Sequence, residues 1–466
     1  MPMLQWMPSL LARHIVKEVV MDRRTFLNTG IKTTLGAAAF MAANPRSSRA
    51  YAANDKIVFA QIGLGGRGKS VGREFARIEG VEMKYCCDVD SERAGGFPDQ
   101  VEAAQGKVPK ALQDFREALD DKDIDAVIVS TPDHWHALAA IWACQAGKDV
   151  YVEKPPSHNI WEGRKMVEAA RKYDRVVQVG TQNRSAPYVK EAKQYIDEGN
   201  IGKLVYVKVF GMEPGRAYRE PENSKKPDSV DYDMYLGPAP KRPFNRGHFH
   251  SNWHNYWAYS GGDLADDGVH QMDIARWIMG KDYPKFVSGY GSNVGLNDDR
   301  DVFDTQSVIY DYGDLMMTWE LTQWATYMRK TPTEVRNSDA FPDWSLSATR
   351  VEFYGTKGRM VMGRHGGGWQ AVDHTGKVVA GQYGRMADPE HRANFAECIR
   401  SRKRPNADIE EGHRSAVLAH AGNIATRMQG ERLEFDSKTE RFKDNDAANA
   451  FVKRNYRLGY EVPVTV

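Results

Sequence analysis

The strongest constraint on the fold is an alternation of short apolar runs and amphipathic stretches between residues 56 and 181. The apolar runs are continuous, which is typical of strands that are covered on both faces. Segments with helical periodicity, such as 137–146 and 163–173, lie between the runs. Repeated strand–helix–strand units predict a parallel, doubly wound sheet. The expected strands are residues 57–62, 81–87, 126–130, 150–152 and 176–179.

After about residue 200 the periodicity changes, and longer strands with alternating polarity dominate. Short turns such as Tyr312-Gly313-Asp314 join them, which predicts an open, mostly antiparallel sheet. Segments 213–260 and 325–348 are polar, contain proline and aromatic residues, and read as long surface loops. The expected strands are 204–212, 285–291, 306–312, 315–321, 350–354 and 360–363, and the expected helices are 267–279, 389–400 and 410–428. The predicted fold class is therefore α/β, with a parallel sheet first and a large open sheet after it.

A glycine-rich turn, Gly63-Leu64-Gly65-Gly66-Arg67-Gly68, follows the first expected strand and opens a helix. The first glycine allows the tight bend, the second lets the backbone approach a pyrophosphate, and the third permits close helix–strand packing. The phosphates would bind free N–H groups at the helix N-terminus. Asp88 ends the next strand, where a carboxylate bonds ribose hydroxyls. Together these features predict a Rossmann domain that binds NAD, while Arg67 leaves NADP open as an alternative.

The N-terminal segment resembles a twin-arginine export signal. Asp22-Arg23-Arg24-Thr25-Phe26-Leu27 precedes a modest apolar run at 30–43, and small residues follow at positions 48, 50 and 52. These three features in this order predict a leader over residues 1–52 and a periplasmic location. Translation could start at Met1 or at Met21, and the sequence leaves both open.

Charge and cysteine content exclude several classes of protein. Of 64 Lys and Arg and 62 Asp and Glu, seven and two fall in residues 1–50, which leaves the remainder with a net charge near −3. This gives no electrostatic footprint for nucleic acid. No run of about 20 apolar residues suggests a membrane span. The four cysteines form no CxxC pair, and their placement indicates core packing.

Three further motifs carry a family resemblance. They are Thr131-Pro132-Asp133-His134-Trp135-His136, Glu153-Lys154-Pro155-Pro156 and Asp266-Asp267-Gly268-Val269-His270. With the glycine turn ahead of them, they make the chain similar to the glucose–fructose oxidoreductase, inositol dehydrogenase and MocA (Gfo/Idh/MocA) family from about residue 56 to at least 430. The resemblance implies an N-terminal Rossmann domain and a C-terminal α/β domain that supports dimers or tetramers. It also implies oxidation or reduction of sugars and cyclitols with NAD(P).

The resemblance places three catalytic residues. Lys154 would follow its strand at the edge where open α/β sheets bind ligands, before a Lys-Pro bond that is commonly cis in the family, and would stabilise negative charge on the reacting oxygen. His270 would be the general acid/base, because imidazole titrates near neutrality. Asp266 lies four residues earlier, so on one helix it would face His270 and orient its ring, or it would serve as an N-cap. Asp267 is near enough to exchange roles with Asp266.

The same resemblance and the same strand ends supply the binding residues. Cofactor contacts are expected from Gly63, Gly65, Gly66, Arg67, Gly68, Asp88, Thr131, Pro132, His136, Glu153 and Lys154, and substrate contacts from Gln182, Asn183, Trp253, His254 and Trp257. Two histidine pairs, His134-x-His136 and His248-x-His250 with His254, have metal-like spacing. No cysteine or carboxylate completes either set in sequence, so no metal site is expected.

These expectations divide the chain into a leader (1–52), a Rossmann domain (55–181), a substrate and oligomerisation domain (182–440) and a C-terminal tail (441–466). The leading functional hypothesis is an NAD(P)-dependent oxidoreductase that acts on a sugar, sugar derivative or cyclitol; the resemblance leaves open whether the cofactor is held tightly, as it is in some members of the family. The first alternative is a glycoside-cleaving enzyme that oxidises, eliminates, adds water and reduces in turn. The second is a Rossmann protein that senses a ligand without catalysis.

Overall fold

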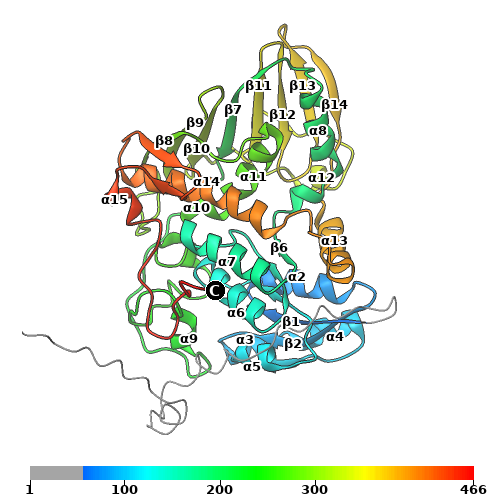
Figure 1. The fold of residues 1–466 in the computed structure, drawn as a ribbon, viewed down its shortest axis with the longest axis vertical. Helices are drawn as coiled ribbons and strands as arrows, with labels where there is room; N and C mark the ends of the chain where they lie inside the picture. The colour runs from blue at the N-terminus through cyan, green and yellow to red at the C-terminus, as the bar shows by residue number, and fades with distance from the viewer. Residues whose placement is uncertain (1–55) are drawn as a thin grey trace, which may run out of the picture. The chain divides into compact units, whose positions relative to one another are not determined.

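The computed structural model describes residues 56–466, so the leader and its arginine pair lie outside the described residues. The N-terminal region contains the expected parallel sheet, with strand order β3-β2-β1-β4-β5-β6 (Figure 1). The change of direction between β1 and β4 is the switch point at which such sheets bind ligands. The strands are β1 (Ile57–Ile62), β2 (Val81–Cys87), β3 (Lys110–Leu112), β4 (Ala126–Val129), β5 (Asp149–Val152) and β6 (Val177–Val179).

Helices cover both faces of this sheet because its strands are apolar on both sides. All four residues of β4 and of β5 are buried. The four cysteines are buried and free, as their placement in the core predicted. The helices are α2 (Gly66–Ala76), α3 (Ser91–Gly95), α4 (Pro98–Gln105), α5 (Arg116–Asp120), α6 (Asp133–Gln145) and α7 (Ile160–Lys172).

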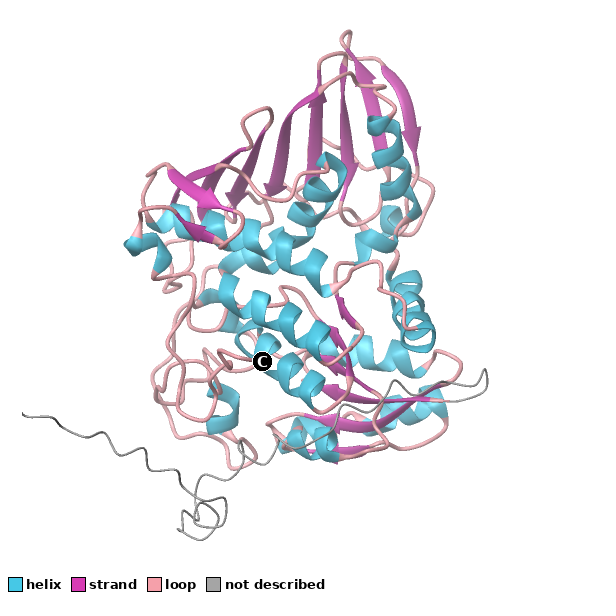
Figure 2. Cartoon of the chain, in the orientation of Figure 1, coloured by secondary structure: helices cyan, strands magenta, loops and turns pink. Residues whose placement is uncertain are grey.

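The second sheet has ten strands in the order β14-β13-β12-β11-β7-β10-β9-β8-β15-β16. All its pairs are antiparallel except β7 with β10, so it is mostly antiparallel as predicted. Figure 2 shows helices along one side of this sheet. The strands are β7 (Leu204–Gly211), β8 (Phe286–Ser292), β9 (Thr305–Asp311), β10 (Met316–Thr322), β11 (Arg350–Gly355), β12 (Gly358–Gly363), β13 (Trp369–Asp373), β14 (Val378–Gln382), β15 (Leu433–Asp436) and β16 (Arg441–Phe442).

Most of the remaining helices pack against this sheet, whereas residues 388–401 pack on the Rossmann core and residues 232–236 in the aromatic segment. Among the described residues, no helix combines the length and the apolarity needed to cross a bilayer. The helices are α8 (Pro187–Asp197), α9 (Tyr232–Leu236), α10 (Gly262–Asp266), α11 (Gly268–Met279), α12 (Thr333–Arg336), α13 (Asp388–Ser401), α14 (Ile409–Arg427) and α15 (Asp446–Asn449), with short 3-10 turns at Gln182–Ser185 and Asn252–Asn255.

Segment 213–260 differs from the prediction of a surface loop. Its aromatic side chains Tyr235, Phe249 and Tyr259 are buried together in a small core of their own. Backbone bonds then fix the segment to the Rossmann region, since Asp231 donates to the carbonyl of Val89 at 2.9 Å. Proline and polar residues suggested exposure, but the burial of large aromatic area decides the packing.

The C-terminal residues also pack on the Rossmann region. Arg454 Nε lies 2.7 Å from the buried carboxylate of Glu162 on α7, and Val462 and Val466 are buried. Tyr460 Oη donates to Asp233 of α9 at 3.1 Å. Residues 450–466 therefore tie α7 to the aromatic segment that precedes α10.

Candidate active site

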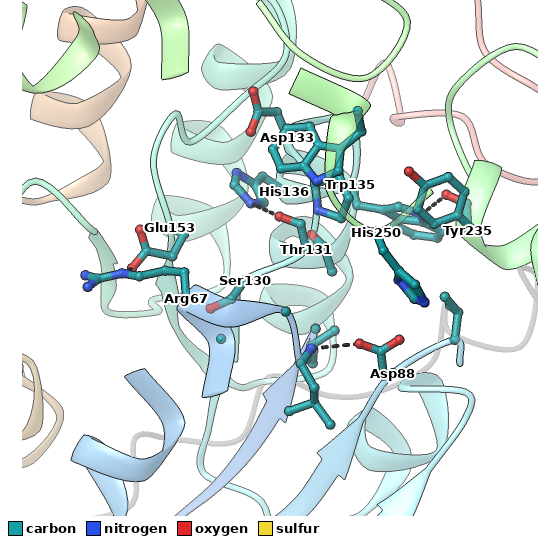
Figure 3. A pocket seen from close by; sticks show the side chains of 18 of the residues that line it. Arg67, Asp88, Ser130, Thr131, Asp133, Trp135, His136, Glu153, Tyr235 and His250 are labelled. Carbon is teal, nitrogen blue, oxygen red and sulfur yellow. Dashed lines mark hydrogen bonds and ion pairs between the residues drawn. The ribbon is translucent and has the colours of Figure 1, made fainter. Parts of the chain in front are cut away.

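A cleft opens at the carboxyl ends of β1, β4 and β5. It is lined by the turn between β1 and α2, by the ends of β2, β4 and β5, and by the aromatic segment before α10 (Figure 3). All the cofactor residues expected from the sequence line it. Sequence reasoning missed several other lining residues, among them Arg93, Asp133, Tyr235 and His250, because most of them come from segments without a known signature.

The glycine turn has the shape that a pyrophosphate cradle needs. Gly63 has φ +86°, and a Cβ there would lie 2.6 Å from the carbonyl oxygen of Ser130. A Cβ on Gly68 would lie 2.1 Å from the carbonyl oxygen of Gly63, so only glycine fits between strand and helix. Above Gly66 a Cβ would meet nothing within 4 Å. The N-terminus of α2 has no side-chain cap, which leaves its first N–H groups free for phosphate oxygens.

The opposite end of the cleft is built around Asp88. Its carboxylate accepts the N–H of Leu64 at 2.8 Å and that of Asp90 at 3.0 Å, so the acid also holds the glycine turn in place. Burial raises the pKa of Asp88 despite these bonds. His250 reaches across from the aromatic segment and lies 2.8 Å from Asp90 Oδ2. Figure 3 shows its ring directed toward Asp88, so two separate segments enclose this end.

Arg67 points away from Asp88. Its Nε donates to Glu153 Oε1 at 2.7 Å, and its guanidinium also lies 3.3 Å from Asp388. The charge of Glu153 is the main reason that the pKa of Arg67 is raised. Because two carboxylates already neutralise this arginine, its placement does not favour a 2′-phosphate beside Asp88. The position of Arg67 therefore gives no support to the NADP alternative that the sequence left open.

Thr131, Pro132 and His136 line the middle of the cleft, and His136 lies in the first turn of α6. Its ring nitrogens lie 2.6 Å from the carbonyl oxygen of Pro155 and 2.8 Å from that of Thr131. Figure 3 shows the second of these contacts. The ring therefore joins the loop after β4 to the loop after β5, and the Lys154–Pro155 bond in the latter is cis.

Lys154, Asp266 and His254 form one chain of charges in the cleft. The Lys154 ammonium pairs with Asp266 Oδ1, and His254 Nδ1 lies 2.9 Å from Asp266 Oδ2. Burial opposes the ammonium, but the charges of Asp266, Asp267 and Asp133 outweigh it and raise the pKa of Lys154. Burial also raises the pKa of Asp133 to about 7, and the charge of Asp266 adds to this effect. Lys154 is consequently a fixed cation rather than a base.

His254 has a raised pKa, because the charge and contact of Asp266 overcome the burial that favours its neutral ring. We expect Asp266→Asn to lower the pKa of His254, so that its ring loses its proton at a lower pH than in the unmodified protein. An NMR titration of the histidine ring protons measures this. His250, which pairs with Asp90 instead, should titrate unchanged and is the internal control. An unaltered His254 titration in the variant would show that the two residues do not interact.

The expected pairing of Asp266 with His270 is wrong. Helix α10 ends at Asp266 and α11 begins at Gly268, so the two residues do not share one continuous helix. The Asp266 carboxylate instead pairs with Lys154 and contacts His254. Asp267 is the residue before α11, but its side chain forms no cap.

His270 is not among the residues that line the cleft. Its ring is buried, and burial together with the charges of Arg364 and Lys154 holds its pKa well below the usual value. Its Nδ1 has no hydrogen-bond partner among residues 56–466. A neutral ring with a free nitrogen is able to accept a proton. No contact in the described part of the chain tests this, so the general acid/base role of His270 stays a prediction.

A second charged cluster surrounds Asp267, and the sequence did not reveal it. Arg364 Nη2 lies 2.7 Å and Lys330 Nζ lies 3.2 Å from the Asp267 carboxylate. Burial, with the charge of Asp267, raises the pKa of Glu213 to about 9, and similar causes raise that of Asp263 to about 7. These residues come from four separate segments, and only the fold brings them together. The raised pKa values favour the protonated forms of Glu213 and Asp263, and a protonated carboxyl can both donate and accept hydrogen bonds.

The expected substrate residues divide into two groups. Trp253 and His254 line the cleft, with ring centroids 3.6 Å apart. Asn183 instead donates to Tyr188 and to the carbonyl of Arg364, and Gln182 is buried near Tyr151. Trp257 lines a different cavity.

The histidine pairs with metal-like spacing separate in space. His134 Nε2 contacts the carbonyl of Tyr235, while His248 lies 2.9 Å from Glu220 and His250 lies near Asp90. Among residues 56–466, no group of three or more His, Cys, Asp or Glu has the arrangement of a metal site.

Known proteins share this architecture. The structure superposes on the WlbA dehydrogenase from Bordetella pertussis, solved with NADH and UDP-GlcNAcA, with a TM-score of 0.60, 20% identity and coverage of 82% of this chain and 99% of that one. For levoglucosan dehydrogenase, in complex with NADH and levoglucosan, the TM-score is 0.60 at 19% identity, with 82% and 99% coverage. At these identities the likeness shows the shared fold.

Curated sequences match as well. The scyllo-inositol 2-dehydrogenase (NAD(+)) of Bacillus subtilis is 28% identical over 330 residues, which cover 66% of this chain and 77% of that protein. The Myo-inositol 2-dehydrogenase of Thermotoga maritima is 25% identical over 221 residues, 47% of this chain and 54% of that protein. The uncharacterized oxidoreductase YrbE of Bacillus subtilis is 27% identical over 227 residues, which cover 49% of this chain and 55% of that protein. The chain therefore spans about half the length of these last two relatives.

Two family regions account for most of the described chain. Residues 57–181 match the GFO_IDH_MocA family, "Oxidoreductase family, NAD-binding Rossmann fold". Residues 188–315 and 359–462 match the "C-terminal alpha/beta domain" of the same family. With the open glycine cradle and the lysine of the cleft, these matches show that the chain belongs to the Gfo/Idh/MocA family of NAD-binding oxidoreductases.

Proposed function

We propose that this oxidoreductase transfers a hydride between a nicotinamide cofactor and a hydroxyl or carbonyl group of a sugar, sugar derivative or cyclitol. The observation that carries this proposal is the Lys154 ammonium, fixed by Asp266 inside the cleft whose other end is the glycine cradle. The residues present fit the dinucleotide, because the cradle is open above Gly66 and α2 is uncapped. When bound, the nicotinamide supplies the hydride acceptor or donor.

The protein's own residues then handle charge and protons. Lys154 donates a hydrogen bond to the reacting oxygen and stabilises the negative charge that develops on it as its proton leaves. Asp266 holds the ammonium in place. The proton acceptor that we propose is His270, whose ring is neutral because burial lowers its pKa. For this role the bound substrate has to extend past the lining of the cleft to reach its unpartnered Nδ1. In the reverse direction the same groups return the proton to the alkoxide.

We propose that the polar cluster around Asp267 binds a polyhydroxylated substrate; the cluster adjoins Asp266, although its own residues are not among those that line the cleft. Burial raises the pKa of Glu213 to about 9 and that of Asp263 to about 7, which favours their protonated forms, and Arg364 and Lys330 supply further donors. Such a mixed set suits hydroxyl groups, which donate and accept at once. Relatives named as inositol 2-dehydrogenases and as levoglucosan dehydrogenase support the same substrate class.

Absorbance at 340 nm tests the proposal directly. We expect NADH to form when the purified protein and NAD are given a panel of sugars and cyclitols, and we expect NADP to serve less well because Asp88 would oppose its 2′-phosphate. Release of a glycoside's leaving group without net change at 340 nm would instead favour the glycoside-cleaving cycle; a "Glycosyl hydrolase family 109 protein" of Shewanella baltica is 33% identical over 122 residues, 27% of that protein. Binding of NAD without either response would favour the sensor and contradict the enzyme.

We also propose that the mature protein is exported to the periplasm. The twin arginines at Arg23 and Arg24, the short apolar run and the small residues after it support this proposal. Cell fractionation of the unmodified protein and of an Arg23→Lys, Arg24→Lys variant reads it out, and an unchanged distribution would argue against it.

A homodimer or homotetramer formed through the second sheet is a further proposal. Ile309 on β9 and Met316 on β10 are 43% and 44% exposed, although neighbouring residues on the same strands are buried. Tyr206 is paired with both Met316 and Tyr354, which places aromatic area beside them. Sedimentation of Met316→Glu against the unmodified protein tests whether this face holds copies together.

A further inference from the structure

A second cavity, of 310 Å³, lies outside the cleft. Its walls are the C-terminal part of α14, the loop 257–261 before α10, residues 158–159 after the Lys154 loop, and residues 450–455 of the C-terminal segment. This volume is at the lower end of the range of about 300–1000 Å³ typical of small-molecule pockets. The lining residues that matter here are His158, Trp257, His420, Arg427, Lys453 and Arg454.

The charge of this lining is unbalanced. It contains three cations, Arg427, Lys453 and Arg454, and no aspartate or glutamate. Glu162, just outside the lining, pairs with Arg454 at 2.7 Å, whereas no ion pair within 4 Å is found for Arg427 or Lys453 among the described residues. Buried and half-buried cations usually have a carboxylate partner, so the unpaired charge of the half-buried Arg427 needs an explanation; Lys453 is exposed, and its ammonium lies 4.0 Å from the centre of the Trp161 ring.

Arg427 is the most unusual of the three. Its guanidinium lies 3.9 Å from the centre of the Trp257 ring and 4.8 Å from that of Phe451. Two aromatic faces hold it in position, but no hydrogen-bond acceptor reaches it among residues 56–466. Burial lowers the pKa of Arg427 to about 10, against the opposing charge of Asp301, whose Oδ1 already accepts the N–H of Trp257. The guanidinium is therefore fixed in place with its hydrogen-bonding capacity unused.

Two more nitrogen atoms of the lining residues lack partners. Arg454 Nη1 and His158 Nδ1 form no hydrogen bond within the described part of the chain, and both atoms are covered, so an anion in the cavity reaches them only if these side chains turn. Buried polar groups without a partner are rare because they lose their bonds to water without replacement. An oxyanion offers several acceptor oxygens at once, and its bonds to guanidinium groups are short and strong.

We propose that this cavity is a binding site for a small oxyanion, a phosphate or carboxylate group, held by Arg427 with Lys453 and Arg454. The site lies behind both catalytic segments. His158 follows the Lys154 loop by four residues, and Ser260 lines the cavity while its hydroxyl contacts Asp133 of the cleft. The proposal does not depend on hydride transfer, because it rests on a separate cavity with its own charges.

Isothermal titration calorimetry tests the site. The protein is first saturated with NAD, so that phosphate cannot enter the glycine cradle, and is then titrated with sodium phosphate, or with sodium citrate, against sodium chloride of equal ionic strength. We expect saturable heat with phosphate, with citrate or with both, and none with chloride. A response to phosphate alone identifies a phosphoryl ligand, and a response to citrate alone identifies a carboxylate ligand. No saturable heat with either anion would overturn the proposal.

Variants separate the site from general attraction of anions. Arg427→Gln should weaken the binding of the anion by about tenfold or more, because it removes a charge-assisted interaction. Lys453→Gln should weaken it by a smaller factor; this side chain is exposed, so folding is unaffected and the variant serves even if Arg427→Gln is unstable. Arg385→Gln, an exposed arginine beside Asp339, is the matched control and should bind as before. If Lys453→Gln and Arg427→Gln both bound the anion as tightly as the unmodified protein does, the site would be refuted.

Discussion

Replacing Lys154 with methionine is expected to lower kcat by about a thousandfold, the scale associated with losing a group that stabilises charge on the reacting oxygen. Methionine keeps the length of the side chain and removes its ammonium. The ion pair with Asp266 disappears at the same time. Steady-state formation of NADH at 340 nm measures the loss, and quenching of tryptophan fluorescence by NAD checks that the cofactor still binds.

The structure supplies the controls for this experiment. Without the ammonium, the buried Asp266 loses the partner whose charge lowers its pKa, so part of the effect could be structural. Adding Asp266→Asn removes that unpaired charge, and the double variant should regain thermal stability without regaining activity. Lys110→Met, at an exposed position on β3, should leave kcat unchanged. Near-normal kcat in Lys154→Met would exclude this lysine from the chemistry.

Gly68→Ala is expected to abolish cofactor binding at ordinary concentrations and to destabilise the Rossmann region. The added Cβ would lie 2.1 Å from the carbonyl oxygen of Gly63, and this backbone cannot yield, since Gly63 is itself pressed against Ser130. Overpacking of this kind costs about 1–3 kcal/mol, and a shift of the turn would misalign the N–H groups of α2. Urea unfolding measures the free energy, and calorimetric titration measures NAD affinity.

Gly66→Ala is the matched control for stability. It lies two residues away in the same turn, at the first position of α2, and its Cβ would meet nothing within 4 Å. Its free energy of unfolding should therefore equal or exceed that of the unmodified protein, because alanine favours helix more than glycine does. If Gly68→Ala were as stable as Gly66→Ala and bound NAD as tightly as the unmodified protein does, the turn would not be the tight cradle described above.

The parallel sheet shows how much of the fold the local sequence pattern predicts. The predicted strands 57–62 and 81–87 coincide with β1 and β2. Continuous apolar runs flanked by helical periodicity leave few alternatives, because both faces must be covered. By contrast β3 has three residues, two of them exposed, and β14 is mostly exposed, so neither carries a hydrophobic pattern that could reveal it.

The helix around His270 shows that local sequence pattern does not predict which side chains become partners. Its periodicity predicted one helix over 267–279, with Asp266 aligned to His270, but the chain makes two helices with a break at Asp267. The charges of Lys154 and His254, which arrive from distant segments, determine where the Asp266 carboxylate lies. Spacing along the chain contains no information about such partners.

The sequence by itself determined the glycine turn, the acid at the end of β2 and the lysine at the end of β5, because each is fixed by backbone sterics or strand direction within a few residues. Tertiary structure alone decided that Asp266 pairs with Lys154, that His250 encloses the end of the cleft beside Asp88 and that Trp257 holds Arg427 in a second cavity. The physical reason is that a side chain's charge state and partner depend on burial and on groups brought from far along the chain. Both become defined only when the aromatic segment and the C-terminal residues pack against the Rossmann region.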